Sequence, residues 1–302
     1  MVVVLAGGTG GAKLARGMLD VVGAEELCVV ANTGDGVEIY GVHVSPDPDL
    51  VALWLADVID ERGFGLRGDT WEVMGALERA GRETWFRLGD RDLALCLVRT
   101  DLLRAGRRLT EAHAEVVRAL GLRARVLPMC DEPVRTHVRV GGRWRPFQEF
   151  MIVDRARAEI EAVELRGIES AHPTPEVLAA LGKAETIVIG PSNPVISIGP
   201  ILAVPGMREA LARAPAPVVA VSPFVGGRAI KGPTEAFCAA AGIEASAQGI
   251  AAAYAGVIDA MVADEPVAGT PALEVDTLMD TAADRARVAR AVLELGSSLA
   301  AR

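Results

Sequence analysis

The first sixteen residues constrain the fold of this chain more than any other stretch. An apolar run at residues 2–5 (VVVL) is typical of a buried parallel strand. The glycine-rich turn at residues 7–11 (GGTGG) follows it, and Lys13 and Leu14 begin a helical pattern. A strand, a glycine turn and a helix N-terminus together present free backbone N–H groups and a positive dipole end, where phosphate can bind. The stretch therefore predicts an α/β fold with a phosphate site, and an ordinary tight turn is the alternative.

The spacing within this turn excludes two familiar nucleotide sites. A Walker A loop ends in Gly, Lys and Ser or Thr, whereas Ala12, Lys13 and Leu14 stand at that point. The dinucleotide fingerprint G-x-G-x-x-G also fails, because Lys13 occupies the place of its last glycine. The turn predicts a nucleotide site that belongs neither to the P-loop ATPases nor to the NAD enzymes.

Composition restricts the partners and the compartment. The 302 residues are 51% hydrophobic and carry a net charge of −9, which argues against nucleic-acid and anionic-membrane binding. We find no signal peptide and no apolar stretch of about 18 residues, so we expect a soluble protein with no membrane partner. The cysteines are far apart and form no C-x-x-C motif, which predicts reduced thiols in a cytoplasmic protein. They are Cys28, Cys96, Cys130 and Cys238.

The hydrophobic pattern divides the chain into two parts. Residues 1–60 and 122–302 alternate between strand and helix patterns, whereas residues 61–121 show helical periodicity with arginine-rich polar faces. This predicts a Rossmann-like α/β core with a mainly parallel sheet and an inserted, mostly helical smaller lobe. Core strands are predicted at 2–5, 27–31, 125–127, 186–189, 218–221 and 258–262, with a hairpin at 137–147. Helices are predicted at 50–59, 93–103, 109–120 and 282–299.

Polar loops follow four of the predicted strands. They are the glycine turn at 7–11 and the loops at 32–35, 190–194 and 222–231. Parallel strands place their carboxyl ends along one edge of a sheet, so we expect these loops to surround one cleft.

Asp35, Asp47 and Asp49 are the carboxylates that we expect beside a divalent cation. Mg²⁺ takes one or two carboxylates together with substrate phosphate oxygens, and it neutralises the charge of a transferred phosphoryl group. Helix capping and turn formation are the alternative roles of these residues, as a helix cap is for Asp90. No Ser or Cys lies in a nucleophile-elbow or triad context, which argues against a covalent intermediate.

A series of short motifs extends along the whole chain. They are residues 7–14 (GGTGGAKL), 32–35 (NTGD), 45–47 (SPD), 88–92 (LGDRD), 127–129 (LPM), 190–194 (GPSNP), 197–200 (SIGP), 221–223 (VSP) and 276–279 (DTLM). In this order they resemble the 2-phospho-L-lactate transferase (CofD/FbiA) family of coenzyme F-420 biosynthesis. The GPSNPxxSIGP block is the most specific element.

The resemblance implies a reaction and a set of ligands. The family transfers a 2-phospholactyl, phosphoenolpyruvyl or phosphoglyceryl group from a guanosine-diphosphate-linked donor to the terminal ribityl hydroxyl of the deazaflavin Fo. GMP leaves and Mg²⁺ assists. The family fold is Rossmann-like, usually a homodimer, with the site between the core and the smaller lobe.

The resemblance also implies roles for residues of this chain. Asp35, Asp47 and Asp49 are the expected catalytic carboxylates, with Asp35 and Asp49 as metal ligands, and Asp90 and Arg91 are expected to bind Fo. The expected nucleotide- and donor-binding residues are Gly8, Thr9, Gly10, Gly11, Lys13, Asn32, Ser192, Asn193 and Ser222.

The chain departs from the family pattern at two places. Gly36 stands where the family usually has a second acidic residue, and residues 45–50 read SPDPDL in place of SPDLDT. A second hypothesis is therefore a non-catalytic regulator that binds a nucleotide or nucleotide-sugar on the same fold. Magnesium-dependent turnover of Fo separates the two.

Overall fold

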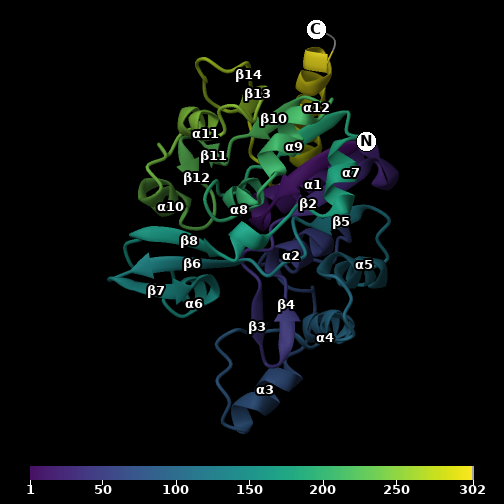
Figure 1. The fold of residues 1–302 in the computed structure, drawn as a ribbon, viewed down its shortest axis with the longest axis vertical. Helices are drawn as coiled ribbons and strands as arrows, with labels where there is room; N and C mark the ends of the chain where they lie inside the picture. Colours follow the sequence, from purple (N-terminus) through teal and green to yellow (C-terminus); the bar gives the residue numbers. More distant parts are fainter. Residues whose placement is uncertain (301–302) are drawn as a thin grey trace.

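The core of the molecule is a seven-stranded, wholly parallel sheet (Figure 1). The computed structural model describes residues 1–300. The strand order is β14-β13-β10-β9-β1-β2-β5, which confirms the predicted α/β class. The strands are β1 (Val2–Ala6), β2 (Leu27–Ala31), β5 (Arg125–Pro128), β9 (Thr186–Ile189), β10 (Val218–Val221), β13 (Ala260–Ala263) and β14 (Ala272–Glu274).

The order of the strands reverses beside β1. This strand pairs with β2 on one side and with β9 on the other, so Val2 lies between Leu27 and Thr186. In such a sheet the crevice for a ligand opens at the carboxyl ends of the two strands where the order reverses. The glycine turn after β1 and the 190–194 loop after β9 therefore face each other across this crevice.

These two loops approach so closely that side chains are excluded. A Cβ on Gly10 would lie 2.0 Å from the carbonyl oxygen of Pro191, and one on Gly190 would lie 3.0 Å from the Cα of Gly11. Glycine at these positions is required by contact between two backbones.

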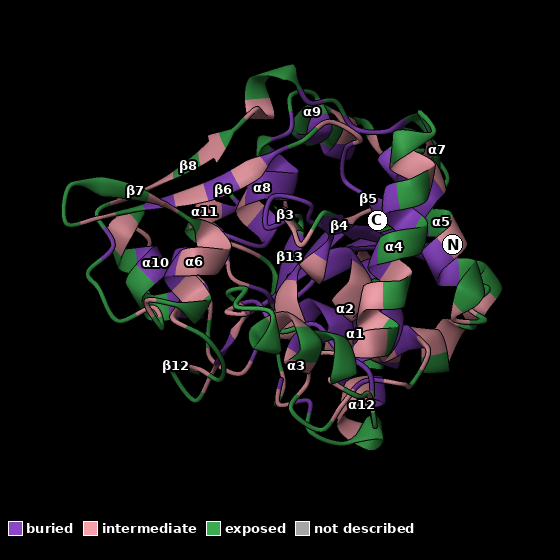
Figure 2. Ribbon diagram, turned by 90° about the horizontal axis from the view of Figure 1, so that it is seen from below, coloured by how far each residue is buried: buried purple, intermediate pink, exposed green. Residues whose placement is uncertain are grey.

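Helices cover both faces of the sheet, because alternate side chains of a strand point to opposite faces. Val2 and Val4 pack with the helices on one face, and Val3 and Leu5 pack with those on the other. Figure 2 shows buried residues gathered at the centre of the molecule and exposed residues along the outer helices and loops. The first face is covered by α1 (Gly8–Val22), α2 (Pro46–Leu55), α5 (Leu109–Ala119) and α12 (Ala282–Ala300). The second is covered by α7 (Pro175–Leu181), α8 (Ile198–Ala203), α9 (Met207–Arg213), α10 (Thr234–Ala240) and α11 (Ala247–Ala253).

A smaller lobe extends from one end of the core (Figure 1). Its own hydrophobic cluster contains Val42, Val44, Met74, Phe86, Leu88 and Cys96. These residues join the hairpin of β3 (Val37–Ile39) and β4 (Val42–Val44) to α3 (Glu72–Arg79) and α4 (Asp90–Arg104). The lobe thus draws on residues before position 60 as well as on the helical segment at 61–121.

A second, three-stranded sheet lies beside the core. It has the order β7-β6-β8 and consists of β6 (Arg135–Val140), β7 (Arg143–Pro146) and β8 (Ala162–Arg166). The predicted hairpin is confirmed, with Gly141 and Gly142 at φ +53° and +74° in its turn. The helix α6 (Phe147–Ile152) follows β7 and buries Phe150 against Phe237 of α10. The remaining short elements are β11 (Phe224–Val225), β12 (Arg228–Ala229), and 3₁₀ turns at Ala24–Glu26 and Ile168–Ser170.

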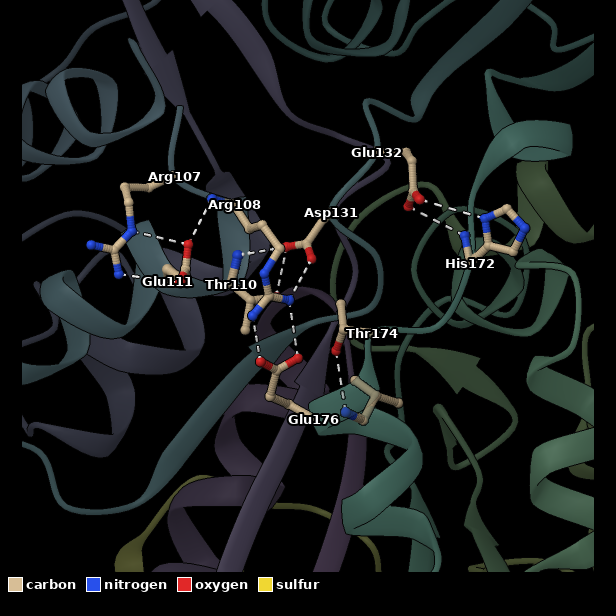
Figure 3. A network of polar contacts seen from close by, with 10 residues as sticks. Arg107, Arg108, Thr110, Glu111, Asp131, Glu132, His172, Thr174 and Glu176 are labelled. Carbon is tan, nitrogen blue, oxygen red and sulfur yellow. Dashed lines mark hydrogen bonds and ion pairs between the residues drawn. The ribbon is translucent and has the colours of Figure 1, made fainter. Parts of the chain in front are cut away.

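A surface network ties α5 to the core (Figure 3). Arg108 pairs with Asp131 at 2.9 Å and with Glu176 of α7 at 2.6 Å. Asp131 also accepts hydrogen bonds of 2.7 Å from the backbone and the hydroxyl of Thr110 at the start of α5. Because exposed ion pairs contribute at most about 1 kcal/mol each, the network orients the helix more than it stabilises the fold.

All four cysteines are buried and unpaired, as predicted. No helix within residues 1–300 has the length and apolar character that a membrane crossing requires.

Candidate active site

Two cavities adjoin at Asp47, which lines both of them. The glycine-loop cavity has a volume of about 290 Å³ and lies over the glycine turn at the switch point of the sheet. The aromatic cavity has a volume of about 780 Å³ and opens toward the smaller lobe. Residues of α6 line both, with Phe147 and Met151 in the first and Gln148 and Ile152 in the second.

Two contacts hold the glycine turn at the start of α1. The backbone N–H of Gly8 donates to Asp47 Oδ1 at 2.7 Å, and that of Gly11 donates to Ser192 Oγ at 2.9 Å. Thr9 and Gly10 lie between them and line the glycine-loop cavity. Their N–H groups belong to the first helical turn, which has no acceptor within the helix, so they suit an anionic ligand.

Asp47 is held from behind by Asn32. The amide nitrogen of Asn32 donates to Asp47 Oδ2 at 2.9 Å and to the carbonyl of Ile196 at 3.2 Å. Burial raises the pKa of Asp47 to about 6, although the hydrogen bonds from Asn32 and Gly8 oppose this. Asn32, which we expected to bind the donor, is fully buried and lines neither cavity. Its position is that of a residue that orients Asp47.

Asp35 lines the glycine-loop cavity with an unsatisfied oxygen. Its Oδ1 atom is buried and has no hydrogen-bond partner among the described residues. Burial is the largest of the effects that raise the pKa of Asp35 well above its ordinary value, and the negative charges of Asp47 and Asp49 raise it further. A buried carboxyl group beside two others is the environment that a cation would neutralise.

Asp49 lies at the aromatic cavity and is paired with a fully buried arginine. The Arg99 guanidinium on α4 forms an ion pair with Asp49 Oδ1 and donates to the carbonyl of His43 at 3.2 Å. His113 of α5, also fully buried, lies 3.8 Å from the same Oδ1 atom. Burial raises the pKa of Asp49, and the charge of Arg99 opposes this. Arg99 and His113 were absent from our sequence predictions, because no motif marks them and only the fold brings α4 and α5 to Asp49.

Two of these carboxylates, Asp35 and Asp49, fit the requirements of a bound divalent cation. Among residues 1–300, no group of three or more His, Cys, Asp or Glu side chains surrounds one point. A cation here would take one or two carboxylates and its other ligands from a phosphate, as Mg²⁺ does. Asp35 fits this through its unpartnered Oδ1, and Asp49 fits because Arg99 and His113 both approach Oδ1 and leave Oδ2 free of these contacts.

Of the two aspartates in the turn at residues 88–92, only Asp92 lines a cavity. Asp90 accepts hydrogen bonds from Thr70 Oγ1 at 2.6 Å and from the backbone of Val73 at 3.0 Å, near the start of α3. Arg91 is exposed and donates to the carbonyl of Arg67 at 2.6 Å. The expected Fo-binding residues Asp90 and Arg91 line neither cavity, whereas Asp92 lines the aromatic one. Successive helical residues point about 100° apart, so these side chains diverge.

The other expected donor-binding residues line the glycine-loop cavity, except Gly11, whose N–H donates to Ser192 Oγ and which lines neither cavity. Asn193 Oδ1 accepts from the backbone of Val195 at 2.8 Å, which shapes its loop. Lys13 lines the cavity, and its Nζ atom lies 3.4 Å from Asp280 Oδ1. The lining includes Gly8, Thr9, Gly10, Lys13, Ser192, Asn193 and Ser222.

Asp92 makes stability depend on pH. The pKa of Asp92 is raised to about 7, mainly by burial and to a lesser extent by the negative charges of Asp49 and Asp69. The unfolded chain loses this proton near pH ~4, so stability falls as the pH rises from about 4 to about 7. We expect Asp92→Asn to raise the free energy of unfolding by about 2 kcal/mol at pH 8 and by little at pH 4, because solvent screens part of the cost. Urea denaturation in magnesium-free buffer measures this.

The control is Asp101→Asn, which removes an equal charge from an exposed position on the same helix. It should alter stability by less than about 0.5 kcal/mol at both pH values. Equal stability of Asp92→Asn and the original protein at pH 8 would contradict the assignment.

A parallel sheet with a glycine turn at its switch point is a Rossmann-like core. Comparison with known proteins places the chain in the class of enzymes that transfer phosphate-containing groups. Residues 2–293 match the family described as 2-phospho-L-lactate transferase CofD, and the chain belongs to that family. This confirms the resemblance that the motifs carry.

Curated relatives agree with this assignment, and a solved structure agrees with the fold. The chain is 41% identical to a phosphoenolpyruvate transferase of Kitasatospora aureofaciens, over 99% of this chain and 98% of the relative. It is 39% identical to a 2-phospho-L-lactate transferase of Methanosarcina mazei, over 87% of this chain and 86% of the relative. The crystal structure of protein BH3568 from Bacillus halodurans is similar in fold, with a TM-score of 0.64 and 20% identity over 97% of this chain and 98% of that one.

Proposed function

We propose that this protein transfers a phospho-acid group from a guanosine-diphosphate-linked donor to the terminal ribityl hydroxyl of the deazaflavin Fo and releases GMP. The group is 2-phospholactyl, phosphoenolpyruvyl or phosphoglyceryl, and the product is an intermediate of coenzyme F-420. We expect the enzyme to be a cytoplasmic homodimer. The observation that carries the proposal is the pair of adjoining cavities of different chemistry, with Asp47 at their junction.

The glycine-loop cavity suits the donor. Its floor carries the N-terminal turn of α1, and Lys13, Ser192 and Asn193 surround it. N–H groups, a helix dipole and an ammonium group are the partners that a nucleoside diphosphate requires. The donor's phosphorus would then lie near Asp47, at the boundary with the second cavity.

The aromatic cavity suits the acceptor. Trp71, Trp85 and Phe86 line it. The guanidinium carbons of Arg62 and Arg87 lie 5.5 Å and 5.3 Å from the centroid of the Trp71 ring. Large, flat, apolar walls with a few polar groups bind a planar tricyclic ring by stacking. Asp92 in the same cavity offers a carboxyl group whose pKa is about 7, able to hydrogen-bond in either protonation state.

The chemistry needs positioning more than a covalent nucleophile. The ribityl oxygen forms a bond to the phosphorus that carries the acid, and the bond from that phosphorus to the GMP oxygen breaks with its electron pair. Asp49, which lines the aromatic cavity, would take the hydroxyl proton, and its ion pair with Arg99 would fix its orientation. Mg²⁺ held by Asp35 and Asp49 would neutralise charge on the transferred phosphate when bound.

Acceptor binding is expected to depend on Trp85. Trp85→Ala should raise KM for Fo by about tenfold and leave KM for the donor within about twofold, because stacking on an aromatic side chain contributes roughly 1–1.5 kcal/mol. Steady-state kinetics with each substrate varied in turn measures both. Trp144→Ala is the matched control, since Trp144 is half-exposed on β7 and lines neither cavity. Equal effects of the two substitutions would contradict the placement of Fo.

Mass analysis of the products tests the proposal as a whole. The protein is incubated with Fo, Mg²⁺ and each of the three guanylylated acids. A phospho-acid adduct of Fo that fails to form without Mg²⁺ would support the transferase. Nucleotide binding without any adduct would favour the alternative, a regulatory nucleotide- or nucleotide-sugar-binding protein, in which Gly36 replaces a carboxylate that the reaction needs.

A further inference from the structure

A glycine-rich loop lines the glycine-loop cavity and contacts residues that line the aromatic cavity. It follows β10, contains the β11–β12 hairpin and ends before α10. Gly226, Gly227 and Gly232 adopt φ values of +58°, +72° and +75°, which only glycine adopts without strain. Lys231, beside the last of them, lines the glycine-loop cavity.

The Lys231 ammonium also reaches the rim of the aromatic cavity. It lies 3.5 Å from the carbonyl oxygen of Arg62 and 5.2 Å from the centroid of the Phe64 ring. A Cβ on Gly63 would lie 3.1 Å from the Lys231 Nζ atom. Lys231 therefore lines the glycine-loop cavity and also contacts Arg62 and Phe64, which line the aromatic cavity.

No carboxylate among residues 1–300 lies within ion-pair distance of Lys231. Lys13, which lines the same cavity, pairs with Asp280, whereas the contacts of Lys231 are a carbonyl group and a ring. Desolvation and the charge of Lys13 lower the pKa of Lys231. Two neighbouring ammonium groups repel each other, so the surroundings of Lys231 favour an anionic ligand.

We propose that Lys231 binds the diphosphate of the donor in the glycine-loop cavity, at the side that faces Arg62 and Phe64. Its contacts with these two residues hold the loops at 226–233 and 61–65 together over the bound substrates. This inference rests on the proposed function for the identity of the donor. An ammonium group at this place would bind non-bridging phosphate oxygens and stabilise the negative charge that GMP carries away when the phosphorus–oxygen bond breaks.

The test compares Lys231→Met with Lys231→Arg and with Arg228→Met. Arg228 lies on the same loop, is exposed and lines neither cavity, so its substitution removes the same charge without the proposed contact. Isothermal titration with GDP, which carries the diphosphate, and with inorganic pyrophosphate measures binding in the presence of Mg²⁺. Thermal unfolding of each variant measures folding independently.

We expect Lys231→Met to weaken GDP and pyrophosphate binding by about tenfold, Lys231→Arg to stay within about threefold and Arg228→Met within about twofold. Unchanged binding by Lys231→Met, or an equal loss in Arg228→Met, would overturn the inference. A lysine-dependent affinity in a protein that makes no Fo adduct would support the inference and overturn the proposed function. A protein that binds neither GDP nor pyrophosphate would overturn both.

Discussion

Replacing Asp49 with asparagine is expected to lower kcat for phospho-acid transfer by at least about a thousandfold and to leave GDP affinity within about threefold. An asparagine keeps the size of the side chain but can neither take the hydroxyl proton nor bind a cation with a full charge. The loss should therefore appear in kcat, because Asp49 lines the aromatic cavity, whereas the proposed diphosphate site is in the glycine-loop cavity, which other residues line. Single-turnover rates and GDP titrations separate the two quantities.

Asp49→Asn also leaves the buried Arg99 without its ionic partner, which costs about 3 kcal/mol. The double substitution Asp49→Leu with Arg99→Leu is the control, because it replaces the pair with apolar groups and should regain most of the stability while remaining inactive. Rates are compared at a temperature where every variant is folded. A folded Asp49→Asn variant with the original kcat would remove Asp49 from the chemistry.

Gly10→Ala is expected to lower the free energy of unfolding by about 3 kcal/mol and to abolish measurable donor binding. The added Cβ would lie 2.0 Å from the Pro191 carbonyl, so the glycine turn and the 190–194 loop must separate. Both loops line the glycine-loop cavity, and a small displacement would misplace the N–H groups that are proposed to bind the donor. Denaturation and GDP titration measure the two effects.

Gly75→Ala provides the comparison, since Gly75 lies within α3 and its nearest neighbour is the flexible end of Arg79, at 3.3 Å. Alanine favours a helix by about 1 kcal/mol over glycine, so this variant should be as stable as the original protein or more so. Equal stabilities of Gly10→Ala and Gly75→Ala would show that the two loops are not in close contact.

The sheet and the first cavity were predictable because their signals are local. The apolar runs at 2–5 and 186–189 are buried strands, and the glycine turn is required by the contact of Gly10 with Pro191. β14 and β8 escaped prediction because their side chains are only partly buried and show no clear apolar alternation.

The individual site residues were harder to predict because tertiary contacts decide their roles. Asn32 follows a strand like any ligand-binding residue, but its amide faces Asp47 and not a cavity. The side chains of Asp90 and Asp92 differ in role because of helix geometry, which the sequence LGDRD does not display. Arg99 reaches Asp49 across 50 residues of sequence, and only the packing of α4 against β4 brings them together.

The most direct test of the account is the ratio of GMP released to phospho-acid adduct formed, measured with Fo, Mg²⁺ and the donor that gives the fastest reaction. Transfer between adjoining cavities predicts one GMP for each adduct, since the bond to GMP breaks only as the bond to Fo forms. GMP release without an equal amount of adduct would mean that water takes the place of Fo, and the absence of both products despite bound GDP would mean that the protein is not a transferase.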